Sequence, residues 1–202
     1  MYDYRKLTDE QKQELTASRK ARGFPIHSPP HFQVDQAIYL LTAACYEHRN
    51  HMTAPERRAE LLDRLFDETI NAGLSIHAWV ILPNHYHILA YAEDFHKLSN
   101  VFGRAHGSTA FAWNGADGKR GRRVWFRFSD RMIRSEAHYL TTLNYIHYNP
   151  VKHGWAGSPY DWVESSVHWY LANYDREWLR DLWARYPLKA YGTSWDGDFD
   201  ID

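Results

Sequence analysis

The sequence predicts an α+β fold in which a ferredoxin-like antiparallel sheet carries helices on one face. Short β-rich apolar runs predict strands at 36–46, 74–82, 85–91 and 124–128. Helical periodicity at 55–72 and 95–113 predicts one helix after the first strand and another after the third. The resulting order, strand-helix-strand-strand-helix-strand, is typical of the ferredoxin-like class. A further helix at 135–148 carries a candidate catalytic tyrosine.

The spacing of apolar residues and turn residues supports these elements. Within 55–72, one side of the predicted helix gathers Leu61, Leu62, Leu65, Phe66 and Ile70. Pro83-Asn84 joins the second strand to the third, and a glycine-rich loop precedes the fourth. No internal repeat is present, so we expect one catalytic domain at 34–170.

The two ends of the chain are predicted to be appendages, at 1–33 and 171–202. Residues 8–22 predict a polar helix, with Thr8 and Gln11 at capping-box spacing, followed by a proline-rich linker. Residues 174–186 predict a last helix, and an acidic tail follows it at 195–202.

Composition narrows the class of protein. The chain has 202 residues, 44% of them hydrophobic and 16% aromatic, which is ample for a core. No apolar run approaches the length that spans a bilayer, and the first residues lack a signal peptide, so we expect a cytoplasmic protein without a membrane partner. The single cysteine, Cys45, excludes an internal disulfide and predicts a small core residue.

Charge is distributed unevenly along a chain whose net charge is only −1. The segment 119–134 carries seven basic residues and one acidic residue, so its local charge is 7 − 1 = +6. Seven like charges in sixteen positions repel one another unless a partner neutralises them. This segment is therefore the predicted polyanion-binding surface, against the alternative of a solvated loop.

Two histidines one residue apart, His85 and His87, lie in the third predicted strand. Alternate side chains of a strand point to one face, so both imidazoles can approach one metal ion while Tyr86 faces the other way. Two imidazoles intrinsically favour Mn²⁺ or Zn²⁺ over Mg²⁺. The pattern predicts a metal site on a strand.

The predicted helix at 135–148 begins at Ser135, a good N-cap, with Glu136 in its first turn. Helical spacing places Tyr145 on the polar face and Asn149 one turn later on the same face. Pro150 disfavours helix at Asn149, so Asn149 is either a third metal ligand or a helix cap. Tyr145 is the candidate nucleophile, with His138 or water as its base.

Two stretches carry a resemblance to a known family. They are Ala78 to His87, with its Leu-Pro-Asn-His-Tyr-His sequence, and Asn144 to Trp155. In this order they resemble the single-tyrosine HUH transposases, and most closely the REP-associated tyrosine transposases of bacteria. The likeness runs from about Gln36 to about Trp169.

The resemblance implies an activity and a set of partners. It implies strand cleavage and transfer on single-stranded or hairpin DNA, with Tyr145 ending as a 5′-phosphotyrosine. It also implies Mg²⁺ or Mn²⁺ held by His85, His87 and Asn149, where many relatives have glutamine as the third ligand. We expect a monomer or homodimer in the bacterial cytoplasm, associated with the nucleoid when bound to DNA.

Basic residues are the predicted DNA contacts. They are Lys119, Arg120, Arg122, Arg123, Arg127, Arg131, Arg134 and Lys152. Trp125, Phe126 and Trp155 are candidates for stacking on bases, although core packing is the commoner role of such aromatic residues.

Two other functions compete with the transferase. A module of the same fold could grip hairpin DNA without cutting it, although intact His85, His87 and Tyr145 argue against this. A zinc hydrolase would require His-x-His to continue as x-Asp-His, whereas Ile88-Leu89-Ala90 follow here.

Overall fold

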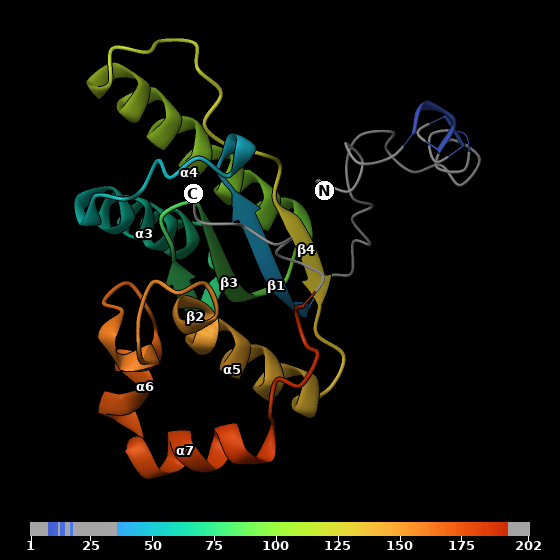
Figure 1. Cartoon of the computed structure of the whole chain (residues 1–202), viewed down its shortest axis with the longest axis vertical. Helices are drawn as coiled ribbons and strands as arrows, with labels where there is room; N and C mark the ends of the chain where they lie inside the picture. Colours follow the sequence, from blue (N-terminus) through green and yellow to red (C-terminus); the bar gives the residue numbers. More distant parts are fainter. Residues whose placement is uncertain (1–7, 12, 15–16, 18–35, 194–202) are drawn as a thin grey trace. The chain divides into compact units, whose positions relative to one another are not determined.

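The computed structural model describes residues 8–11, 13–14, 17 and 36–193, and the chain divides into two compact units (Figure 1). In the first unit, the Thr8 amide donates to Gln11 Oε1 and the Gln11 amide donates to Thr8 Oγ1, at 2.9 and 3.3 Å. These reciprocal bonds confirm the predicted capping box. Residues 9–11, 13–14 and 17 are helical, while the other residues of the predicted first helix, the proline-rich linker and the acidic tail lie outside the described residues.

The second unit, described here from residue 36 to residue 192, is built on a four-stranded antiparallel sheet in the order β2-β3-β1-β4. Its strands are β1 (Ala37–Ala44), β2 (Ser75–Ile81), β3 (His85–Ala92) and β4 (Ser129–Met132). Helix α3 (Pro55–Asn71) follows β1, and α4 (Phe95–Ala116) follows β3. The predicted ferredoxin-like order is therefore confirmed.

The fourth strand begins later than the sequence pattern predicts. Within the predicted strand 124–128, Trp125 forms only an isolated bridge with Cys45, and the Phe126 amide donates to the Ala44 carbonyl. The ladder to β1 starts at Ser129, which pairs with Thr42. The aromatic run marks packing instead: Trp125 is buried and its Nε1 donates to Thr109 Oγ1 at 3.0 Å.

Helices cover both faces of the sheet. Alternate residues of the central strands, including Tyr39, Leu41, Tyr86 and Ile88, form the main core with α3 and α4, and Cys45 belongs to this core as predicted. The other face of β3 meets α5 (Glu136–Lys152), as the contacts of its histidines show below. In Figure 1, α5 lies next to β2 and apart from α4. The predicted arrangement with helices on one face therefore holds for α3 and α4, while α5 covers the opposite face.

Helix α5 runs four residues beyond the predicted end. Ser135 caps its start by accepting from the His138 amide, as predicted. Pro150 lies inside the helix, so Asn149 stays helical and does not act as the cap, a role taken by His153. Four consecutive residues from Asn144 to His147 are buried, so the predicted polar face of this helix is not a solvated face.

The C-terminal part of the unit packs on α5. The sequence did not predict α6 (Val167–Asn173), and it did predict α7 (Arg176–Arg185) within residues 174–186. The Asn144 amide nitrogen donates to the carbonyls of Leu182 and Tyr186 at 3.1 and 2.8 Å, which fixes the end of α7 against α5. In the described part of the chain, no helix is both long and apolar enough to cross a bilayer.

Candidate active site

The two strand histidines point to the face of β3 that α5 covers, and both are buried. His85 Nδ1 donates to Asn84 Oδ1 at 2.7 Å, and His87 Nδ1 lies 2.7 Å from Thr42 Oγ1. Hydrogen bonds of this kind at Nδ1 fix the orientation of an imidazole and leave its Nε2 atom to bind a metal ion or a substrate. The fold therefore turns both Nε2 atoms toward the helix.

Helix α5 presents two polar atoms to these nitrogens. The Tyr145 hydroxyl lies 3.3 Å from His87 Nε2, and Asn149 Oδ1 lies 3.2 Å from His85 Nε2. Tyr145 and Asn149 are one turn apart, as the helical spacing predicts. The structure thus brings together the four residues His85, His87, Tyr145 and Asn149, which are far apart in the sequence.

The proton count at His85 shows what could bind there. A neutral imidazole whose Nδ1 proton goes to Asn84 has only a lone pair on Nε2, and that lone pair faces another acceptor, Asn149 Oδ1. If Asn149 Oδ1 is the atom that faces Nε2, the two acceptors at 3.2 Å are brought together by a second proton on His85 or by a cation; if the amide is flipped, its nitrogen donates to Nε2 instead. Within the described part of the chain, no three His, Cys, Asp or Glu side chains gather as a metal site, so a metal here depends on the Asn149 amide oxygen.

Tyr145 is fully buried, under a segment that follows α7. Gly192 has a positive φ of 78°, and a Cβ at this position would collide with the Tyr145 ring. Lys152 Nζ lies 5.0 Å from the centre of the same ring and donates to the Gly192 carbonyl at 3.0 Å. Residues 191–192 therefore cover the Tyr145 ring and would have to move before a substrate could reach the hydroxyl.

His138, one of the two candidate general bases beside water, contacts a different tyrosine. Its Nε2 lies 3.1 Å from the Tyr191 hydroxyl, which also bonds to Thr142 Oγ1. The Tyr191 ring packs edge-on against Tyr145, with centroids 5.6 Å apart. His138 thus lies beside Tyr191, which in turn packs on Tyr145. The imidazole nitrogen next to the Tyr145 hydroxyl is His87 Nε2, which is also a candidate metal ligand.

Sequence reasoning missed four residues of this site, Thr42, Asn84, Tyr191 and Gly192. Asn84 directly precedes His85 and could have been suspected as its partner. Thr42 meets His87 only because β1 and β3 pair in a particular register. The last two approach Tyr145 from the far end of the chain, and no local pattern indicates that contact.

The predicted DNA contacts fall into two groups. Lys119, Arg120, Arg123, Arg127, Arg131 and Arg134 are exposed and Arg122 is partly exposed, so this segment remains a possible contact surface. Lys152 belongs instead to the Tyr145 site. Trp125 is buried in the core. Phe126 is partly exposed, and the centre of its ring lies 5.3 Å from the guanidinium carbon of Arg123.

The fold and the site define a ferredoxin-like protein in which two strand histidines meet a helix tyrosine on the face of the sheet that α5 covers. No family model matches the chain. A REP-associated tyrosine transposase of Escherichia coli K12 is 29% identical over 118 residues, which cover 53% of this chain and 64% of that protein. A Haemophilus influenzae protein that carries the same name provisionally is 31% identical over 131 residues, covering 60% of this chain and 66% of its own length.

These relatives confirm the resemblance: over the aligned residues, the chain is a homologue of the REP-associated tyrosine transposases. The chain spans somewhat less than two thirds of the length of both curated relatives. A solved REP-associated tyrosine transposase bound to a REP hairpin has the same fold, with a TM-score of 0.59 and 24% identity. That match covers 72% of this chain and 86% of the solved one.

Proposed function

We propose that this chain is a DNA strand transferase that cleaves single-stranded DNA at hairpin or palindromic repeats. The observation that carries the proposal is the convergence of the Tyr145 hydroxyl and the Asn149 amide oxygen on the Nε2 atoms of His87 and His85. A nucleophile and a candidate metal site side by side are what an attack on a phosphodiester requires. The names of the curated relatives, and the hairpin bound to the solved one, support the same activity.

In the proposed reaction, the Tyr145 oxygen attacks phosphorus and forms a new O–P bond. The P–O3′ bond breaks, its electron pair leaves with the 3′ oxygen, and that oxygen gains a proton to become a hydroxyl. The phenolic proton is lost in the same step, and the nearby ammonium of Lys152 stabilises the negative charge that develops on the ring. The phosphotyrosine conserves the energy of the ester, so a 3′ hydroxyl can later reverse the step and rejoin a strand.

His85, His87 and Asn149 suit a divalent ion, which we propose to be Mn²⁺ or Mg²⁺. Two imidazole nitrogens and one amide oxygen are a mixed donor set, and a cation between His85 Nε2 and Asn149 Oδ1 would satisfy both acceptors. When bound, the ion would neutralise charge on a non-bridging phosphate oxygen. The protein's own contribution is to hold the imidazoles in one orientation through Thr42 and Asn84.

A covalent-trapping experiment tests the nucleophile. The full chain is incubated with Mn²⁺ and a hairpin that has a labelled single-stranded flank, and peptides are then analysed by mass spectrometry. Wild type and the control Tyr148→Phe, an exposed tyrosine on the same helix, should form an adduct on Tyr145. Tyr145→Phe should form none and should lose cleavage by roughly three orders of magnitude or more, while hairpin affinity stays nearly unchanged.

The covering of Tyr145 by Gly192 favours one alternative, a hairpin-binding module that does not cut. Hairpin binding without any adduct, in wild type as in Tyr145→Phe, would support that module. An adduct that survives in Tyr145→Phe would refute the assignment of the nucleophile.

A further inference from the structure

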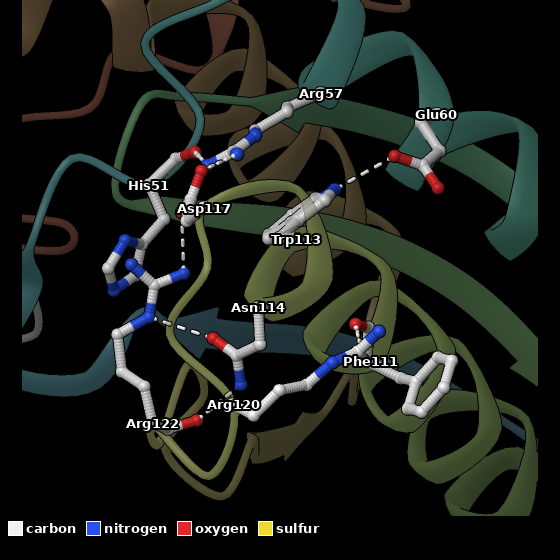
Figure 2. Close-up of polar contacts among 9 residues, drawn as sticks. All are labelled: His51, Arg57, Glu60, Phe111, Trp113, Asn114, Asp117, Arg120 and Arg122. Carbon is white, nitrogen blue, oxygen red and sulfur yellow. Dashed lines mark hydrogen bonds and ion pairs between the residues drawn. The ribbon is translucent and has the colours of Figure 1, made fainter.

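Two arginines from separate segments converge on one carboxylate (Figure 2). Arg57 lies in the first turn of α3, Asp117 directly follows α4, and Arg122 lies in the loop 118–123. Arg122 Nη2 lies 2.7 Å from Asp117 Oδ2, Arg57 Nη1 lies 3.3 Å from the same oxygen, and Arg57 Nη2 contacts Oδ1. Each guanidinium therefore presents N–H groups to the same small volume.

Both arginines are also held by groups other than Asp117. Arg57 Nη1 donates to the His51 carbonyl at 3.1 Å, and its guanidinium lies 5.5 Å from the Trp113 ring centre. Arg122 Nε donates to Asn114 Oδ1 at 2.8 Å, and the Asn114 amide nitrogen donates to the Arg122 carbonyl at 2.6 Å. Each guanidinium thus has a second anchor besides the carboxylate.

The carboxylate does not balance the positive charge around it. Arg57 and Arg122 carry two positive charges against the one negative charge of Asp117, so the sum over the three ion-paired side chains is 2 − 1 = +1. The three side chains of the cluster are accessible, with exposed fractions of 23% for Arg57, 16% for Arg122 and 26% for Asp117. A second anion can therefore reach the two arginines from solvent.

The cluster lies at the same end of the sheet as the strand histidines. His51, whose carbonyl holds Arg57, belongs to the loop that follows β1. In the same loop, the His48 carbonyl accepts from the Asn84 amide nitrogen at 3.4 Å, and Asn84 Oδ1 accepts from His85. A short chain of contacts therefore joins this cluster to the proposed active site, and one DNA molecule could contact both.

We propose that Arg57 and Arg122 form a clamp for a phosphate of the DNA backbone, and that Asp117 occupies this clamp until DNA replaces it. The proposal rests on the proposed function, because it takes the ligand to be DNA. A carboxylate and a phosphate offer the same pair of acceptor oxygens to an arginine fork. The ion pair between Asp117 and the arginines is weak because water can reach it. A DNA phosphate that binds the same arginines also releases counterions, which adds entropy, so replacement of Asp117 by the phosphate is favourable.

The structural alternative makes the opposite prediction. If Asp117 served only to hold the basic loop in place, its removal would loosen the loop and weaken DNA binding. In the clamp, Asp117 competes with the phosphate, so its removal strengthens binding. The sign of the change in affinity separates the two roles.

The experiment measures the affinity of the full chain for a hairpin with a single-stranded flank over a range of salt concentrations. Asp117→Asn should tighten binding about three- to fivefold, because it removes a competitor worth a weak ion pair. The matched control is Glu177→Gln on the exposed face of α7. It also removes one negative charge and one ion pair with an arginine, Arg180. It should leave affinity unchanged.

Two further variants probe the clamp from the arginine side. Arg57→Met should weaken binding and flatten the slope of log affinity against log salt by about 0.7 to 0.9. Arg57→Lys keeps the positive charge but loses the two parallel N–H groups of the guanidinium. It should therefore weaken binding and leave the slope of log affinity against log salt nearly unchanged. Circular dichroism and melting temperature report whether each variant stays folded. Hairpins with and without the flank, and a linear single strand, identify which part of the DNA supplies the phosphate.

The outcomes separate this proposal from the proposed function. Weaker binding by a folded Asp117→Asn variant, or the same change in Glu177→Gln, would overturn the clamp alone. Unchanged affinity and slope in Arg57→Met would do so as well. A wild-type chain that binds none of the three DNAs would refute the proposed function together with the clamp, while loss of cleavage alone would leave the clamp standing.

Discussion

The Tyr145 site and the Arg57–Asp117–Arg122 clamp are built in opposite ways. In the Tyr145 site, the four central side chains of His85, His87, Tyr145 and Asn149 are buried. Each of them meets a partner from a distant element, as His87 meets Tyr145. In the clamp, the side chains are partly exposed and are ion-paired to a carboxylate that water can also reach. Burial holds reacting groups in fixed positions, whereas exposure lets a charged ligand replace an internal partner.

This difference predicts separate responses to the same tests. Substitutions in the buried site should change the rate of cleavage and leave the salt dependence of binding unchanged. Substitutions in the clamp should change affinity and its salt dependence while leaving chemistry on bound DNA unaffected. A variant that changes both quantities would show that the two regions act as one.

After Tyr145→Phe, the largest effect is expected for the strand histidines. His85→Ala and His87→Ala should each reduce Mn²⁺-dependent cleavage at least about 100-fold, because each removes a proposed metal ligand. Hairpin affinity should be retained, and His96→Ala, on the exposed start of α4, is the matched control. The measurements are single-turnover cleavage and metal binding by calorimetry. Full activity of either histidine variant, or of wild type in EDTA, would contradict the metal site.

A smaller effect is expected at Asn149, whose role depends on which amide atom faces His85. Asn149→Ala should reduce metal affinity and cleavage about 10- to 100-fold, the usual cost of disturbing a metal site at one position. Asn149→Asp keeps an oxygen toward the metal and should restore most of the activity. If the amide instead turned its nitrogen to donate to His85, Asp would fail to restore it. Metal titration of both variants therefore tests the third ligand directly.

The sequence predicted the parts of the molecule that depend on local patterns. Alternation along β3 placed His85 and His87 on one face, and helical spacing placed Tyr145 one turn from Asn149. The sequence overestimated the effect of Pro150, because packing of α5 on the sheet holds the helix through it. It also placed β4 too early, since Trp125 packs in the core and Phe128 packs against it without joining the ladder.

Contacts between distant segments could not be predicted in this way. Thr42 reaches His87 through strand pairing, and Gly192 reaches Tyr145 from beyond α7. The clamp is a similar case, because Arg57 and Arg122 are separated by a strand pair and a helix. The basic run at 119–134 indicated a polyanion surface, but only the fold shows that Asp117 pairs with Arg122 and that Arg57 completes the cluster.

The smallest effect is expected from acid, and it distinguishes the two regions once more. Hydrogen bonds from Arg57, and then from Arg122, lower the pKa of Asp117 from 3.8 to about 2. A carboxyl whose pKa is lowered by folding contributes stability above its ordinary pKa, and that stability is lost as the pH falls toward the lowered value. Asp117 should therefore stay ionised and keep competing with DNA throughout mild acid, so that salt, and not pH, opens the clamp.

Titration of the Asp117 side-chain carboxyl by carbon-13 NMR checks this expectation. Its resonance should remain that of a carboxylate through the range in which free aspartates become protonated, and Arg57→Met should move its midpoint back toward the ordinary value. The buried site, unlike the clamp, should be sensitive to mild acid. Protons compete with a metal ion for the imidazoles, so acid should reduce cleavage. A midpoint near 3.8 in wild type would mean that the two arginines do not hold Asp117, and the clamp would then lack its internal competitor.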